Sequence, residues 1–312
     1  MPSLPSHLDR TLYPFEGKTR VIGGHTMHYL DEGEGDPLVL VHGNPTWSWM
    51  FRRLVHDLSG TYRVIAPDHI GCGLSDKPDD ADYPYTLARR IEDLETLLEE
   101  IGVTKRVTYI VHDWGGAIGL GVASKLPERV RRVVVMNTSA FGLPEGTRFP
   151  PILWWFRHTP LGPMLIRGLN LFCRGTMMIG CRRSKMPAAV RAGYLAPYDN
   201  WTTRRAVLRF VEDIPLKMSH RSWDTLQSVE RRLDRLREVP MQLFWGDRDP
   251  VFGRSFRLSW RRRFPNLEAH VYPRAGHLVL EDAYDLIVPQ LTRFLSEDPG
   301  FHRPGTLELI DE

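Results

Sequence analysis

Cysteine is scarce in this sequence, and its few positions form no recognisable site. Cys72, Cys173 and Cys181 are far apart and lie in no CxxC or Cys/His cluster. This spacing excludes a disulfide framework and the usual arrangement of zinc ligands. Free thiols are typical of a reducing compartment, so we expect a cytoplasmic protein without a bound metal.

Long apolar runs and a strong net charge are also lacking. No run of about 18 apolar residues is present, and the opening MPSLPSHLDR lacks the charged-then-apolar profile of a signal peptide. We therefore expect a soluble chain with no membrane span. A net charge of +3 is too small to indicate nucleic-acid binding.

The middle of the chain is nevertheless locally basic. We expect this segment to be a solvated face, with a surface for acidic lipid or for a partner as the alternative. The bias comes from Arg157, Arg167, Arg174, Arg182, Arg183 and Lys185.

The sequence contains enough apolar residues for a large core. With 312 residues, 42% of them hydrophobic, it can form one core or a core with an inserted subdomain. Short apolar runs alternate with amphipathic helical patterns, of which LARRIEDLETLLEEIG is the clearest. This alternation predicts an α/β fold with a mostly parallel central sheet and helices on both faces. The expected strands are Tyr29-Leu30, Leu38–Val41, Tyr62–Pro67, Val107–Val111, Val133–Met136, Met241–Trp245 and Ala269–Tyr272.

The alternation stops between Gly142 and Glu230. This segment is rich in Pro, Trp, Arg and Met and shows helical periodicity only. We expect residues 142–230 to form a helical cap inserted into a core of residues 1–141 and 231–312. Open α/β sheets bind ligands at the carboxyl edge of their strands, so the cap is expected over that edge. The alternative is that these helices only extend the core.

A strand, a sharp turn and a helix are predicted around His112-Asp113-Trp114-Gly115-Gly116. This is the layout of the nucleophile elbow, whose usual sequence is G-x-S-x-G. Asp113 stands in the position of the serine, and a carboxylate is a competent nucleophile toward saturated carbon that bears a good leaving group. The alternative role for Asp113 is to cap the following helix.

Three further residues complete a candidate site. Asp113, Asp249 and His277 follow one another in the chain in the order nucleophile, acid and histidine, which is the order of the hydrolase triad. His277 follows the last predicted strand and is the expected general base, and Asp249 is the expected acid that orients its imidazole. Asp247 is the alternative acid. Asn44, in VHGNPTWSW, lies where an oxyanion donor is expected, and its side-chain amide can donate to an anion.

The motifs together resemble the haloalkane dehalogenase family of the α/β-hydrolase superfamily. The resemblance spans roughly residues 24–294 and rests on HGNPTWSW, PDHIGCGLSDKP, VHDWGG, GYLAPYDNW with RFVEDIP, and AGHLVLEDA. It implies hydrolysis without metal or organic cofactor, through an alkyl-enzyme ester on Asp113 that gives an alcohol and a halide. The indole of Trp114 and the amide of Asn44 would hold the halide, with core packing as the alternative role of Trp114. Some members carry the triad acid after the strand Val133–Met136, but no carboxylate follows here, so Asp249 is implied.

The same resemblance leaves more than one reaction open. We expect a haloalkane dehalogenase-type hydrolase, but the chain also looks like the subgroup that contains β-lactone decarboxylases of long-chain alkene synthesis. Epoxide hydrolysis would need Tyr194 and Tyr198 as acids, and a binding protein without activity is a further alternative. The expected partners are water and a small apolar substrate, a haloalkane or a β-lactone. Chain length of the substrate, halide preference, homo-oligomer formation and the role of the tail Asp298–Glu312 stay open.

Overall fold

The computed structural model describes residues 9–298 and 305–310, and within them the strands form one nine-stranded sheet. The strand order is β1-β2-β4-β3-β5-β6-β7-β8-β9. Only the pairs β1·β2 and β2·β4 are antiparallel, so the sheet is mostly parallel, as the sequence predicted. The strands are β1 (Lys18–Ile22), β2 (His25–Glu32), β3 (Pro37–Val41), β4 (Arg63–Pro67), β5 (Val107–Asp113), β6 (Val130–Thr138), β7 (Met241–Gly246), β8 (Glu268–Tyr272) and β9 (Leu307–Leu309).

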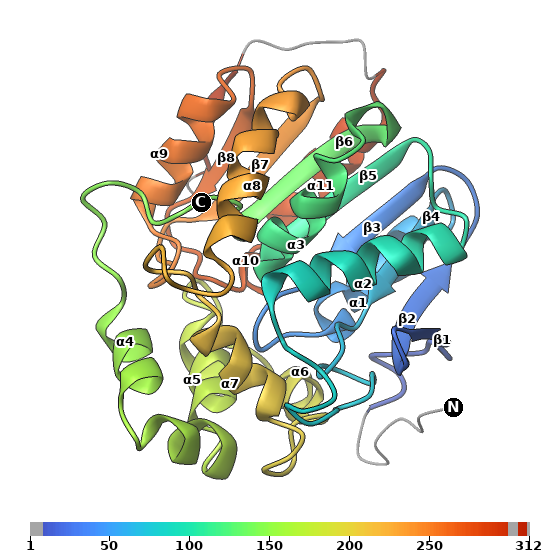
Figure 1. Ribbon diagram of the computed structural model, residues 1–312. Helices are drawn as coiled ribbons and strands as arrows, with labels where there is room; N and C mark the ends of the chain where they lie inside the picture. Colours follow the sequence, from blue (N-terminus) through green and yellow to red (C-terminus); the bar gives the residue numbers. More distant parts are fainter. Residues whose placement is uncertain (1–8, 299–304, 311–312) are drawn as a thin grey trace.

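Helices cover both faces of this sheet, and each face has its own apolar core (Figure 1). On one face lie α2 (Leu87–Glu100), α3 (Trp114–Ala123), α8 (Trp223–Arg232) and α9 (Arg254–Arg263). On the other lie α1 (Arg52–Leu58), α10 (Val279–Asp282) and α11 (Tyr284–Ser296). Strands buried on both faces are continuous apolar runs, which explains why the central strands could be predicted. Short helical turns are η1 (Ser48–Phe51), η2 (Pro127–Arg129) and η4 (Leu233–Leu236).

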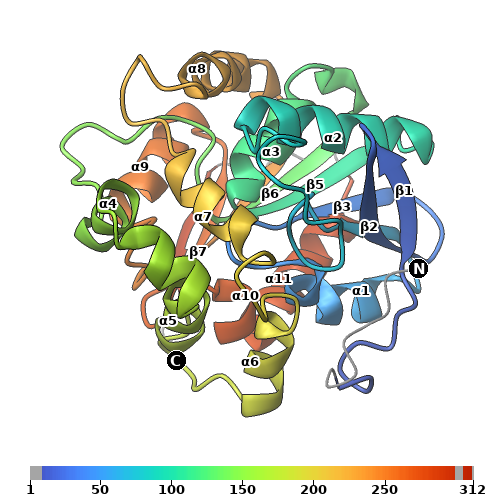
Figure 2. The same ribbon diagram turned by 60° about the horizontal axis from the view of Figure 1, so that its bottom comes forward.

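The predicted helical segment lies together at one end of the sheet. Figures 1 and 2 show α4, α5, α6 and α7 grouped at this end. Their bounds, with the π-helical turn η3, are α4 (Pro151–His158), η3 (Met164–Gly168), α5 (Leu171–Ile179), α6 (Ala188–Leu195) and α7 (Arg205–Glu212). The segment after β3 holds one of these helices, α6, because Trp47 Nε1 donates to Gly193 O at 3.2 Å and Trp49 Nε1 donates to Val190 O at 3.2 Å. The helices therefore cover the edge at which β3 and β5 end.

The division into a core and a cap at residue 230 remains a prediction. Helix α8 crosses that position and packs against α2 and α3. The first eight residues, on which a signal peptide was judged absent, lie outside the described residues, as do positions 299–304 and 311–312 of the tail. In the described part of the tail, β9 pairs in parallel with β8. Among the described residues, none of the helices combines the length and the apolar character needed to cross a membrane.

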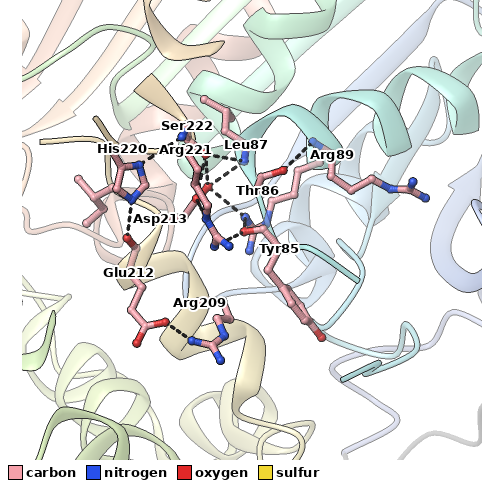
Figure 3. A network of polar contacts seen from close by, with 12 residues as sticks. Tyr85, Thr86, Leu87, Arg89, Arg209, Glu212, Asp213, His220, Arg221 and Ser222 are labelled. Carbon is pink, nitrogen blue, oxygen red and sulfur yellow. Dashed lines mark hydrogen bonds and ion pairs between the residues drawn. The ribbon is translucent and has the colours of Figure 1, made fainter. Parts of the chain in front are cut away.

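A buried carboxylate joins the end of α7 to the start of α2 (Figure 3). Asp213 Oδ2 accepts a hydrogen bond from Leu87 N at 2.8 Å, at the positive end of the α2 dipole. The hydroxyl of Ser222 and Nε of Arg221 donate to the same carboxylate at 2.8 and 3.0 Å. Arg90 Nη1 lies 3.6 Å from Asp213 Oδ2, and both side chains are fully buried. These contacts join the end of α7, one of the helices over the site, to α2 on the sheet.

Candidate active site

Asp113 occupies a strained turn between β5 and α3. Its φ is 52° and its ψ is −125°, in a region that non-glycine residues rarely adopt, at a cost of about 1–3 kcal/mol. The neighbouring glycines allow this turn. A Cβ on Gly43 would lie 2.1 Å from Asp113 Oδ1, and one on Gly115 would lie 1.9 Å from Val41 O. The side chain makes no N-cap hydrogen bond to α3, so the capping role is not observed.

His277 and Asp249 lie behind Asp113 in a line. His277 Nδ1 is 2.8 Å from Asp249 Oδ2, and its Nε2 is 3.7 Å from Asp113 Oδ2. Asp247, the alternative acid, instead pairs with Arg257 at 3.1 Å, and its side chain is 29% exposed. The structure thus brings together three of the predicted residues and leaves Asp247 outside the site.

Asn137 was not singled out in the sequence, although it holds Asp249 in place. It lies near the end of β6 with a positive φ of 33°, and its Nδ2 donates to Asp249 Oδ2 at 2.9 Å and to Gly246 O at 3.0 Å. Gly246 N donates back to Asn137 Oδ1 at 2.8 Å. The sequence offered one signal for it. Asn137 follows the strand after which some members of the haloalkane dehalogenase family carry the triad acid. Here an amide at that position orients the acid supplied by β7.

The second oxygen of Asp249 is also satisfied. Its Oδ1 accepts from Val251 N at 2.7 Å and from Phe252 N at 3.0 Å. Burial alone would raise the pKa of Asp249, but the charge of His277 and these hydrogen bonds hold the pKa below its usual value. Asp249 is therefore an anion that fixes the imidazole of His277 in one orientation.

The side chains of Asp113 and His277 face each other, with Oδ2 and Nε2 3.7 Å apart. The pKa of each is raised, which favours the neutral form of the carboxyl and the charged form of the imidazole. Burial raises the pKa of Asp113, and this effect is partly offset by His277 and by the backbone amides of Asn44 and Trp114. Burial would lower the pKa of His277, but Asp249 and Asp113 outweigh it and raise the pKa to about 9. Near neutral pH the site therefore holds an imidazolium at His277, opposite the side chain of Asp113.

Asn44 contacts the carboxylate of Asp113 through its backbone amide. Asn44 N donates to Asp113 Oδ1 at 2.6 Å. Its side-chain Nδ2 donates to Val207 O of α7 at 3.1 Å, and its Oδ1 is buried without a partner among the described residues. An amide nitrogen has two hydrogens, so one remains for an anion in the cavity. Trp114 lies at the start of α3 with its ring 5.4 Å from that of Phe210, and both Asn44 and Trp114 line the cavity.

A cavity of about 410 Å³ opens above Asp113 and His277. Its walls are almost entirely apolar, and the two catalytic candidates are its only ionisable side chains among the described residues. The larger apolar wall residues include Phe141, Phe149, Ile152, Leu153, Phe156, Leu171, Phe172, Ile179, Leu226, Phe252 and Phe256. A dry cavity of this kind suits an apolar substrate and strengthens every electrostatic contact within it.

Neither tyrosine that epoxide hydrolysis would require lines this cavity. The hydroxyl of Tyr194 donates to Glu281 at 2.9 Å, and that of Tyr198 donates to Thr46 O at 3.2 Å. Neither of these two tyrosines therefore supplies epoxide opening with an acid above Asp113. Among the described residues, no cluster of His, Cys, Asp and Glu side chains is arranged to hold a metal ion.

Comparison with known proteins places the chain in a family. The profile of the alpha/beta hydrolase fold matches residues 36–284. The cis-3-alkyl-4-alkyloxetan-2-one decarboxylase of Shewanella oneidensis is 44% identical over 92% of this chain and 90% of its own length, and that of Xanthomonas campestris is 44% identical over 88% and 94%. A haloalkane dehalogenase of Mycobacterium marinum is 35% identical over 82% of this chain and 84% of its own length.

A solved haloalkane dehalogenase from Agrobacterium tumefaciens shares the fold, with a TM-score of 0.81 at 23% identity over 92% of this chain and 99% of that one. The resemblance found in the motifs is thus confirmed by matches that extend over most of the chain. The chain belongs to the alpha/beta hydrolase fold family, in which its relatives are oxetan-2-one (β-lactone) decarboxylases and haloalkane dehalogenases.

Proposed function

We propose that this protein is a β-lactone decarboxylase that converts a cis-3-alkyl-4-alkyloxetan-2-one into an alkene and carbon dioxide. The observation that carries the proposal is the 44% identity, over about nine-tenths of the chain, to two relatives of that name. The haloalkane dehalogenase at 35% identity is more distant. Haloalkane hydrolysis, which the motifs favoured, therefore becomes the second candidate.

The walls of the cavity support a substrate with two alkyl arms. One part of the wall comes from α4 and α5, including Leu153 and Phe172, and another comes from α8 and α9, including Leu226 and Phe256. These two groups of apolar side chains belong to segments far apart in the sequence. Each can hold one alkyl arm while the polar ring faces Asp113 and His277.

The proposed first step is an attack of the Asp113 carboxylate on ring carbon C4. The Asp113 O–C4 bond forms as the C4–ring-oxygen bond breaks, and a free carboxylate is released on C3. The imidazolium of His277 and the N–H groups of Asn44 and Trp114 are donors suited to this new anion. No proton is gained or lost in this step.

In the second step the C3–carboxylate bond breaks and carbon dioxide leaves. Its electron pair forms the C=C bond, and the C4–Asp113 bond breaks to restore the carboxylate. Attack at C4 occurs opposite the ring oxygen and places Asp113 anti to the carboxylate on C3. Anti elimination then gives a cis alkene from a cis lactone, and the sequence of steps consumes neither water nor a cofactor.

Haloalkane hydrolysis is the second candidate because of one specific arrangement. His277 Nε2 lies near Asp113 with Asp249 behind it. Ester formation on Asp113 removes one of the charges that raise the pKa of His277, so the neutral imidazole can activate a water molecule against the alkyl-enzyme ester. Epoxide hydrolysis receives no comparable support.

A parallel assay separates the two candidates. Purified protein is given a long-chain cis-dialkyl β-lactone in one reaction and a short bromoalkane in another, and alkene and bromide are followed. We expect alkene from the lactone at a kcat/KM far above that for bromide release, and no product of either kind from Asp113→Ala. Efficient bromide release with no alkene would overturn the first candidate in favour of the second.

A further inference from the structure

The segment over the cavity is far more basic than the rest of the chain. Residues 146–198 contain eight Arg and Lys side chains and no Asp or Glu. The whole chain has 41 basic and 38 acidic side chains, so the remainder is acidic. The eight basic residues are Arg148, Arg157, Arg167, Arg174, Arg182, Arg183, Lys185 and Arg191.

Large apolar side chains on this segment point outward. Trp154 is 52% exposed, Met164 is 61% exposed and Met178 is 72% exposed. None of the three lines the cavity, so their exposed surface faces the outside of the molecule. On α5, Leu171, Arg174 and Met178 follow each other at helical spacing and are all exposed, which makes a mixed apolar and cationic stripe.

This surface is continuous with the cavity. Ile152 of α4 and Leu171 and Ile179 of α5 line the cavity and are also exposed. Figures 1 and 2 show α4 and α5 at the outer side of the helices that cover the site, away from α2 and α3. We call the surface of α4, η3, α5 and the following loop to Lys185 the cap face.

We propose that the cap face docks on an anionic lipid surface. Exposed Trp and Met side chains beside Arg and Lys are typical of segments that lie in the interface of an anionic membrane. Arg174, Arg182 and Lys185 are exposed and form no ion pair with any described residue, so their charges are available to phosphate groups. An acidic protein face would satisfy the charges but would leave the scattered, protruding apolar side chains without matching pockets.

Docking would place the opening of the cavity against the acyl chains. A long-chain apolar substrate dissolved in the bilayer could then enter between Ile152 and α5 without crossing water. This consequence rests on the proposed function, whereas docking does not, because it depends only on the surface.

Vesicle co-sedimentation of the full chain, without substrate, tests the proposal. Vesicles of phosphatidylcholine with about one-third phosphatidylglycerol are compared with pure phosphatidylcholine vesicles. We expect binding to the anionic vesicles only, and most of it should be lost between about 0.1 M and 1 M salt because the charges become screened. No binding to either vesicle would overturn docking and leave the proposed function untouched.

Matched variants locate the contact. Neutralising the triple Arg174→Gln, Arg182→Gln, Lys185→Gln should weaken vesicle binding on the order of a hundredfold, because each basic residue near an anionic surface contributes about fivefold. The control triple removes the same charge from exposed positions outside the cap face, Lys105→Gln, Arg231→Gln and Arg262→Gln, and should leave binding within about twofold. Equal losses in both triples would show a net-charge effect and contradict a specific face.

The apolar part of the contact has its own variant. Trp154→Ser with Met178→Ser should weaken binding by at least about tenfold, and this loss should persist at high salt, because it removes apolar burial instead of charge. Circular dichroism and the thermal midpoint of each variant check that it is folded. If this variant bound vesicles like the wild type but changed an oligomer into a monomer by ultracentrifugation, the face would be a contact between copies and the proposal would fail.

Discussion

At the residue scale, the charge on His277 depends on the two carboxylates that flank it. Asp249 and Asp113 raise its pKa to about 9 against the opposing effect of burial. Below that pH the imidazolium is present and can stabilise the carboxylate released from the lactone ring; above it the cation is lost. We therefore expect kcat/KM for alkene formation to fall as the pH rises through about 9.

A pH profile of wild type and Asp249→Asn checks this expectation. The variant removes one of the negative charges that raise the pKa of His277, so its alkaline limb should move to lower pH. An alkaline limb that stays in the same place in both proteins would assign it to another group.

Asn137→Ala tests the residue that holds Asp249, the proposed triad acid. The variant removes a hydrogen bond to the buried carboxylate of Asp249, and bonds to charged groups contribute about 1.5–3 kcal/mol. We expect kcat to fall by roughly tenfold to a hundredfold with little change in KM, and the alkaline limb of the pH profile to shift. The matched control is Asn266→Ala, an exposed Asn outside the site, which should change neither.

His277→Ala distinguishes the two candidate reactions by their need for a base. Hydrolysis of an alkyl-enzyme ester needs an activated water, so with a short bromoalkane the variant should accumulate a covalent adduct on Asp113, visible by intact-mass spectrometry. Decarboxylation needs no water, so with the lactone the variant should still form alkene, more slowly. A lactone adduct that accumulates without alkene would contradict the proposed second step.

The positions of some residues in the candidate site were predictable from the sequence, and those of others were not. Asp113 was predictable because its strained turn requires small neighbours, which HDWGG displays. The choice of Asp249 over Asp247 agrees with the observed contact to His277. The contacts of Asn137, Tyr194 and Tyr198 join distant segments. The sequence marks the position of Asn137 after its strand, but it carries no signal for any of these contacts.

At the scale of elements, the junction between α7 and α2 depends on one carboxylate. Asp213→Ala would leave the buried guanidinium of Arg90 without its ion-pair partner and remove an acceptor from the first turn of α2. Breaking a buried pair in this way costs about 3–5 kcal/mol, so the free energy of unfolding measured in urea should fall by that order. Asp234→Ala is the control, because it breaks an exposed pair with Arg237 at 3.0 Å and should change the stability by less than about 0.5 kcal/mol. If both variants lost the same free energy of unfolding, the buried pair at this junction would stabilise the fold no more than an exposed ion pair does.

The elements themselves were largely predictable. All seven expected strands lie within or overlap observed strands, because strands buried on both faces are apolar throughout. The strands β1 and β9 were not predicted. Each lies at an edge of the sheet and exposes most of its residues, and neither sequence contains an apolar run that would mark a strand. Helix α8 illustrates another limit: its amphipathic pattern does not tell whether it packs on the sheet helices or over the cavity.

At the scale of the whole molecule, the proposed substrate rests on the cavity and on the similarity to relatives, because the proposed triad does not distinguish the two candidate reactions. An Asp113 nucleophile with His277 and Asp249 serves both candidate reactions equally well. The apolar wall is assembled from α4, α5, α8, α9 and the segment after β6, and no local sequence pattern shows which side chains face inward. For this reason the motifs favoured haloalkane hydrolysis, whereas identity over the full chain favours β-lactone decarboxylation.

The central claim is tested most directly by the product formed from a cis-3,4-dialkyl β-lactone by purified protein, identified by gas chromatography and mass spectrometry. The account predicts a cis alkene in equal amount to the lactone consumed, and none from Asp113→Ala. A β-hydroxy acid as the product would show that the enzyme hydrolyses the ring, and it would contradict decarboxylation.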